Sequence, residues 1–289
     1  MSAYVMQHRR ATDIAELAHS VADFYFPDSW IDPEVVIRKN RVTLSFGRYR
    51  NSFDGMLEWR PSGFHIYCNL DRVVNSTSDR ARFTLGHELG HYFIDSHRNA
   101  LRSGRAPSHP SFCSEAQAKL AVEAEANHFA SHLLMPQDRA VKVLPPTRNA
   151  VSISDVELLQ ESFRVSFQSA AIRAVNTAER VGCACVFRNS NGKVWYVVSP
   201  AFEAAGYANI RRDDRPLLDG CATAECLASE AEEDTAGRRF ESVTTASQWF
   251  YRVAVGSGRD VILDETAIRL GPYGVFTLLT EHKMRTRPS

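Results

Sequence analysis

The segment GHELGHYF, residues 86–93, restricts the fold of this chain more than any other stretch. His87 and His91 are four residues apart, and Glu88 directly follows the first histidine. On an α-helix, residues four apart lie on the same face, one turn above the other. The two imidazoles can then reach one common atom. Apolar residues at the same period predict a second, buried stripe on this helix.

This spacing suits a metal ion. Zn²⁺ takes neutral imidazole nitrogens in a tetrahedral shell. Glu88 lies beside the open coordination position rather than in it, and there it can accept a proton from water, as in metallopeptidases with an H-E-x-x-H helix. An ordinary helix with two partly exposed histidines is the alternative, so a third ligand is needed to decide.

Two candidates for a third ligand compete. His97 lies ten residues after His87, where one class of zinc peptidase has its third histidine. That class turns the chain with a glycine, and this chain has Ile94 there. A continuing helix carries His97 about 9 Å along the axis beyond His91 and around to another side, which predicts an end-of-helix or surface histidine. Glu123 and Asn127 are four apart on a later helix and fit a ligand with a residue that orients a ligand histidine.

Other polar residues of that later helix are expected elsewhere. Glu125 points roughly opposite to Glu123 and is predicted to face solvent. His128 and His132 repeat the four-residue spacing without an adjacent glutamate, which favours buried or surface histidines over ligands.

The strand GFHIYCNL, residues 63–70, precedes the two-histidine helix. A peptide can add to such a strand through main-chain hydrogen bonds, and His65 or Tyr67 would then contact the substrate. An internal strand of the sheet is the alternative. Cys68 is the weaker candidate for a metal ligand.

Two motifs in order carry a family resemblance. RFTLGHELGHYF followed by EAEANHFASHLLMP resembles the ImmA/IrrE group of bacterial metallopeptidases, over roughly residues 40–140. The resemblance implies that His87, His91 and Glu123 bind one Zn²⁺ per chain, with Mn²⁺ as an alternative occupant. It implies Glu88 as the catalytic base and Asn127 as the residue that orients a ligand histidine.

The same resemblance implies an activity. Members of this group are soluble zinc-dependent endopeptidases that cleave a DNA-binding repressor of the helix-turn-helix class, often encoded beside them. Cleavage derepresses genes for stress response or mobile-element transfer.

The fold class predicted from patterning is α+β. Three domains are expected: a zincin-like peptidase domain at 1–145, a helix-turn-helix-like connector at 146–180, and a β-rich, regulatory C-terminal domain at 181–289, which is GAF-like in some relatives. Helices are expected at 11–26, from Ser76 to about 93, from a capping box at 114–117 to Pro136, at 154–163 and at 167–177. Strands are expected at 42–46, 55–59, 64–70, 183–187 and 194–198, with a hairpin turn at 60–63 and loops at 98–112 and 230–234.

The connector is the part that bears on DNA binding. Gln168, Arg173 and Asn176 are expected to be exposed on its second helix. Only Arg164 and Arg173 supply positive charge there, which favours a structural role over DNA reading.

The charge of the whole chain also argues against DNA binding, because 34 basic and 34 acidic residues give a net charge of zero. We therefore expect no strong attraction to nucleic acid or to a membrane surface. The N-terminus lacks secretory features, no apolar stretch reaches membrane-spanning length, and the six cysteines lack zinc-ribbon spacing, so a reduced cytoplasm is expected. The alternatives to the peptidase are a DNA-binding regulator with a structural zinc and a non-catalytic scaffold.

Overall fold

The computed structural model describes residues 6–28, 30–105, 111, 121–145, 150–189, 191–211, 220–229, 238–251, 260–271 and 274–282. The chain forms two compact units, Met1–Val143 with Leu159–Ser169, and Leu144–Leu158 with Ala170–Ser289. Both helices and sheets are present, so the α+β class is confirmed. The three-domain division at 1–145, 146–180 and 181–289 stays a prediction.

The first unit contains a three-stranded sheet, with strands β1 (Thr43–Gly47), β2 (Gly55–Arg60) and β3 (Gly63–Asn69). The strand order is β1-β3-β2, with β1 parallel and β2 antiparallel to β3. Arg60 pairs with Gly63 across the tight hairpin turn, as the sequence predicted. Gly63 has a φ of 120°, a conformation that favours glycine.

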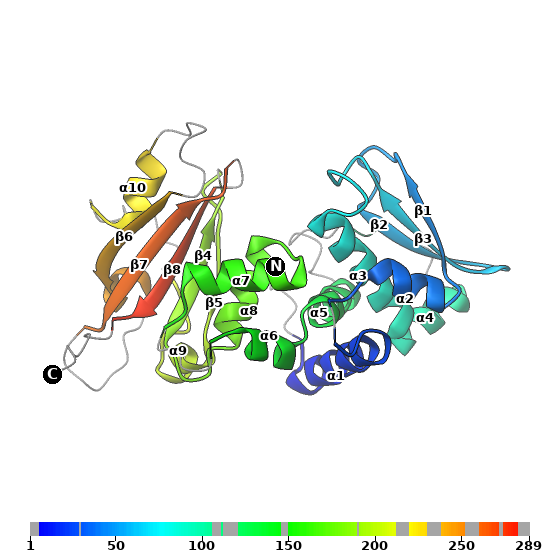
Figure 1. Cartoon of the computed structure of the whole chain (residues 1–289), viewed down its shortest axis with the longest axis horizontal. Coiled ribbons are helices and arrows are strands. Elements are labelled where there is room, and N and C mark those ends of the chain that lie inside the picture. Colours follow the sequence, from blue (N-terminus) through cyan, green and yellow to red (C-terminus); the bar gives the residue numbers. More distant parts are fainter. Residues whose placement is uncertain are drawn as a thin grey trace. The chain divides into compact units, whose positions relative to one another are not determined.

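The helices of the first unit lie on one side of this sheet (Figure 1). They are α1 (His8–Tyr25), α2 (Pro33–Lys39), α3 (Asp79–Phe93), α4 (Asp95–Arg102), α5 (Ala121–Leu134) and α6 (Gln137–Val143). Leu57 and Ile66 of the sheet share one buried cluster with Leu85 and Leu89 of α3. The apolar stripe of the two-histidine helix therefore faces the core.

Two boundaries differ from the prediction. Helix α3 begins at Asp79 rather than near Ser76, because the Ser78 hydroxyl accepts a hydrogen bond from the Ala81 N–H and caps the helix. Residues 98–102, predicted as loop, belong to α4. Ile94 is extended and separates α4 from α3, so the chain turns before it becomes helical again. The capping box at 114–117 and the acidic segment 230–234 lie outside the described residues.

Helices α7 (Ile153–Phe163) and α8 (Phe167–Asn176) lie where the sequence predicted the two helices of the connector. Gln168 and Asn176 are exposed as expected. Arg173 is instead buried, and burial lowers its pKa to about 10. The expectation that Arg173 is exposed is therefore wrong, because the side of α8 that carries it also carries buried alanines and packs inward.

The buried Arg82 of α3 joins the end of α7 to the first unit. Its guanidinium donates to the backbone carbonyls of Ile31, Phe163 and Arg164. It also lies over the Trp30 ring, 5.0 Å from the centroid. This one side chain satisfies carbonyls where α7 ends, which explains why Leu159–Ser169 pack with the first unit.

The second unit contains a five-stranded antiparallel sheet in the order β5-β4-β8-β7-β6 (Figure 1). Its strands are β4 (Cys183–Arg188), β5 (Val194–Val198), β6 (Arg239–Thr245), β7 (Ile262–Arg269) and β8 (Val275–Glu281). Its short helices are α9 (Pro200–Ala204), α10 (Ala222–Ala228) and α11 (Ala246–Trp249). Its core includes two apolar clusters, one containing Phe250 and one containing Cys226.

Within the described part of the chain, no helix has the length and apolar character needed to cross a membrane.

Candidate metal centre

Helix α3 presents two imidazoles on one buried face. His87 and His91 are both buried, and their Nε2 atoms are 3.0 Å apart. The geometry follows from the four-residue spacing, which places the second ring one turn along the same face. Both Nε2 atoms are thus directed at the same small volume.

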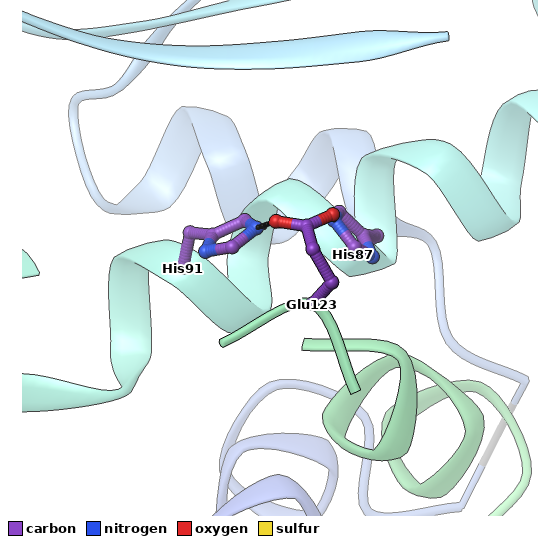
Figure 2. Close-up of side chains that lie close together, drawn as sticks. All are labelled: His87, His91 and Glu123. Atoms are coloured by element: carbon purple, nitrogen blue, oxygen red, sulfur yellow. Dashed lines mark hydrogen bonds and ion pairs between the residues drawn. The ribbon is translucent and has the colours of Figure 1, made fainter. Parts of the chain in front are cut away.

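Helix α5 brings a carboxylate to this volume. Glu123 Oε2 is 3.3 Å from His87 Nε2, and Glu123 Oε1 is 3.3 Å from His91 Nε2. Figure 2 shows the carboxylate lying between the two rings. One ligand atom from each of the three buried residues lies within 4.8 Å of the others. The sequence-predicted ligands are therefore brought together, whereas their role as ligands stays a prediction.

Close packing of the two helices makes this meeting possible. A β-carbon at Gly90 would lie 3.0 Å from Ala126 Cα and 3.1 Å from its carbonyl oxygen. A β-carbon at Gly86 would lie 3.4 Å from Ala130 Cβ. Glycines four apart on α3 therefore face alanines four apart on α5, and α3 approaches α5 more closely than larger residues allow. Two glycines inside a helical pattern are the sequence signal for such a close contact.

Asn127 lies one turn beyond Glu123 and contacts His87. Its Oδ1 is 2.8 Å from His87 Nδ1. Since an amide oxygen only accepts, His87 Nδ1 carries a proton in this arrangement, which leaves Nε2 as the nitrogen that can bind a metal in the neutral ring. Asn127 therefore stands where the sequence predicted a residue that orients a ligand histidine.

Burial dominates the electrostatics of the two histidines. It lowers the pKa of His91 to about 3, so this imidazole is neutral near pH 7. Burial also acts to lower the pKa of His87, but the hydrogen bond with Glu123 and the charges of Glu88 and Glu123 outweigh it. The pKa of His87 is consequently raised above its ordinary value. Metal binding requires a neutral imidazole, so a cation that binds His87 would displace the extra proton from its ring.

The three donors fit a metal site. Two imidazole nitrogens and one carboxylate are the protein ligands of many catalytic zinc sites, where the fourth position is left for water or substrate. The site is buried and the carboxylate already lies near both imidazoles, so the donor set matches a divalent cation.

Glu88 lies on the same helix, beneath the start of strand β2. It is buried, and its negative charge acts on the pKa of His87. A β-carbon at Gly55 would lie 2.6 Å from Glu88 Oε1 and 2.6 Å from Thr84 Cγ2. The backbone of β2 therefore passes directly over the carboxylate. Gly55 was missed by sequence reasoning, because a glycine that opens a strand gives no signal of what lies across from it.

His65 and Tyr67, the predicted substrate-binding residues, lie apart from this group. Side chains alternate along a strand, so both project from the face of β3 opposite to Ile66 and Cys68. Tyr67 O–H donates to Glu58 Oε2 at 2.9 Å, and His65 Nδ1 is 2.6 Å from Thr43 Oγ1. The structure does not bring these two side chains to His87, and their role in binding substrate stays a prediction.

Two other expectations need correction. His97, predicted at a helix end or the surface, lies in the first turn of α4 but is buried, and Glu125, predicted to face solvent, is buried as well. His97 Nε2 is 3.1 Å from Glu125 Oε2, which in turn pairs with Arg10. The reason is the turn at Ile94, which ends α3 and directs α4 back toward α5.

The remaining candidates stay outside the cluster formed by His87, His91 and Glu123. His132 Nδ1 is 3.1 Å from His19 Nε2, and His128 Nε2 is 3.0 Å from the Ala11 carbonyl oxygen. Cys68 of β3 is buried in the core of the first unit, and burial, followed by the charge of Glu88, raises its pKa to about 12. It is therefore a protonated thiol, which is a poor metal ligand.

Comparison with known proteins bears on this geometry. The family model Peptidase_M78, described as "IrrE N-terminal-like domain", matches residues 73–175. No curated protein matches the chain. A solved Mycobacterium tuberculosis transcriptional regulator is similar over 98% of this chain and 93% of its own, at 12% identity and a TM-score of 0.50, which shows a similar fold only. The matched segment, residues 73–175, contains His87, His91 and Glu123, and its similarity to this family model supports a metallopeptidase domain of the ImmA/IrrE type.

Proposed function

We propose that this chain is a zinc-dependent endopeptidase in which His87, His91 and Glu123 hold the metal ion and Glu88 is the general base. The observation that carries the proposal is the buried cluster of two imidazoles and one carboxylate, built from two helices of a peptidase-family domain. A peptidase family implies a protein substrate.

The chemistry divides between the metal and the chain. A bound Zn²⁺ would polarise the scissile carbonyl and make a water molecule more acidic. Glu88 accepts the proton of the attacking water and returns it to the departing amine. Asn127 keeps His87 in the tautomer whose Nε2 has a free lone pair. The backbone of β2 covers Glu88 at Gly55 and limits the positions that its carboxylate can take.

For the substrate we propose a DNA-binding repressor of the helix-turn-helix class, encoded close to this chain. Support comes from the family resemblance, in which cleavage of such a repressor derepresses stress-response or mobile-element genes. The adjacent-gene product is therefore the protein to test first.

The experiment incubates metal-loaded protein with that repressor and follows fragments by gel electrophoresis and mass spectrometry. We expect a small number of defined fragments, and none after the metal is removed with a chelator. Re-addition of zinc should restore cleavage. An intact repressor in every arm would favour the scaffold alternative.

A DNA-binding regulator is the second candidate, since the solved structure with a similar fold is described as a transcriptional regulator. The α7–α8 pair has the order of a helix-turn-helix. Burial of Arg173 weighs against it, because that guanidinium is not available to phosphate or bases.

A further inference from the structure

Three side chains from three helices meet beside the proposed ligands. Arg10 of α1, His97 of α4 and Glu125 of α5 form a connected group, which we name the Arg10–Glu125–His97 network. Arg10 Nη2 is 2.5 Å and His97 Nε2 is 3.1 Å from the same oxygen, Glu125 Oε2. His97 and Glu125 are buried, whereas the Arg10 side chain is 37% exposed.

This network touches the candidate metal centre through His97. The His97 and His91 rings have centroids 5.2 Å apart and planes inclined at 41°. His97 Nδ1 is buried and meets no hydrogen-bond partner among the residues that the structure describes. The contact of Nε2 with Glu125 is therefore the polar contact that sets the rotation of this ring.

The orientation of His91 matters for metal binding. Its Nε2 is 3.3 Å from Glu123 Oε1 and 3.0 Å from His87 Nε2, so rotation of the ring would remove one of the three donors. A ring packed against it restricts that rotation. His97 occupies this position, and Glu125 and Arg10 hold His97 there.

Glu125 also bears on which carboxylate of α5 binds the metal ion. It is a second buried carboxylate, two residues from Glu123 on the same helix. An ionised carboxylate near a divalent cation is a potential competing ligand. Arg10 and His97 both contact its Oε2 and so compete with a metal ion for this carboxylate, which is not part of the cluster of possible ligands.

We propose that His97 is a positioning residue that fixes the ring of His91 for metal binding, and that Arg10 and Glu125 act by holding His97. The proposal rests on the proposed function, in which His91 and Glu123 are metal ligands. Removing a side chain that supports a metal ligand typically costs about 10–100-fold in metal affinity.

The test uses the full chain, stripped of metal, in four variants. His97→Ala removes the ring, His97→Phe keeps a ring without the contact to Glu125, and Glu125→Gln keeps the shape without the charge. Asp23→Asn is the matched control, because it breaks another ion pair of α1, with Arg139 at 2.5 Å. Each protein is titrated with Zn²⁺ against a chelator and with Co²⁺, whose visible absorption reports the coordination geometry.

We expect His97→Ala to bind zinc about 10–100-fold more weakly and to change the Co²⁺ spectrum, with Asp23→Asn unchanged in both. His97→Phe should keep more of the wild-type spectrum than His97→Ala, and Glu125→Gln should weaken zinc binding in the same direction. If His97→Ala does not fold, His97→Phe and Glu125→Gln decide the matter. Thermal unfolding of the metal-free proteins separates loss of stability from loss of metal geometry.

Wild-type zinc affinity and Co²⁺ spectra in all three network variants would overturn the proposal, even if those variants unfold at lower temperature. A wild type that binds metal but cleaves no protein would remove the proposed enzymatic function, and the metal readouts would still decide the role of His97. A wild type that binds no metal would overturn both.

Discussion

Glu123 is the ligand candidate that comes from α5, whereas the two histidines share α3. Glu123→Ala should lose most of its zinc, because two imidazoles alone leave the ion without its carboxylate ligand. Asn127→Ala should retain zinc with an affinity reduced by about 10–100-fold, since it only orients His87. Elemental analysis of the purified proteins measures the zinc content of both variants, and a zinc titration against a chelator measures the affinity of Asn127→Ala. Full zinc content in Glu123→Ala, together with its complete loss in His97→Ala, would identify His97 as the third ligand.

The network residues also give the metal-free protein a predicted acid sensitivity. Burial lowers the pKa of His97 below its ordinary value of 6.5. Burial acts to raise the pKa of Glu125, but the hydrogen bond and charge of Arg10, with His97, outweigh it and the pKa lies below 4.5. Both groups bind protons more weakly in the folded state than in the unfolded state. The stability they contribute is present above these ordinary values and is lost as the pH falls through the lowered pKa values.

Denaturant unfolding of metal-free wild type and Glu125→Gln at a series of pH values tests this. The free energy of unfolding of wild type should exceed that of the variant above pH 4.5, and the gap should shrink at lower pH. A gap that stays constant over the whole range would show that ionisation of Glu125 contributes nothing to stability.

The packing of α3 against α5 is the contact between elements that forms the candidate metal centre. Gly90→Ala places a methyl group 3.0 Å from the backbone of α5 at Ala126, so the helices must separate, at a cost of about 1–3 kcal/mol in unfolding free energy. Separation also moves Glu123 away from the histidines and should weaken zinc binding. Gly86→Ala is the matched control, because its methyl group would be in ordinary contact at 3.4 Å and alanine favours a helix.

Calorimetry and a zinc titration of the two variants measure the difference. If Gly90→Ala binds zinc as tightly as Gly86→Ala, close approach of the helices is not what positions Glu123.

Helices and strands were predictable from the sequence where neighbouring residues alone determine them. Periodicity and Pro136 located α3 and α5, and a tight turn located the β2–β3 hairpin. Helix α4 was partly missed, because its start depends on the extended conformation of Ile94, which no periodicity indicates. The same turn explains why His97 and Glu125 were misplaced: a straight continuation of α3 would have carried His97 away from α5.

Site geometry followed the same rule. His87 and His91 share one face of α3, and Glu123 and Asn127 share one face of α5, as their spacing predicted, since helix faces are fixed by sequence separation. That these two faces meet was implied by the family resemblance and not by spacing. The cover over Glu88 at Gly55 and the network around Glu125 depend on which elements pack together. Those contacts bring together residues far apart in the sequence, so no local pattern reveals them.

For the whole molecule, zero net charge and the burial of Arg173 predict weak DNA binding. Any binding should be indifferent to sequence and should decline steeply with salt, because phosphate contacts release counterions. Fluorescence anisotropy with labelled duplexes over a range of salt concentrations measures this. A sequence-selective complex abolished by Gln168→Ala would instead support the regulator, since Gln168 is exposed and its loss does not disturb the core.

The central claim is that this molecule cleaves protein with Glu88 as the base, and the most direct measurement compares wild type with Glu88→Gln. The amide keeps the size of the side chain but does not accept the proton of the attacking water. Both metal-loaded proteins are incubated with the candidate repressor, and zinc content and fragment formation are followed in the same samples. We predict equal zinc content, retained substrate binding and cleavage reduced by about 10²–10⁴-fold in the variant. Equal cleavage by both proteins would contradict the assignment of Glu88 as the base.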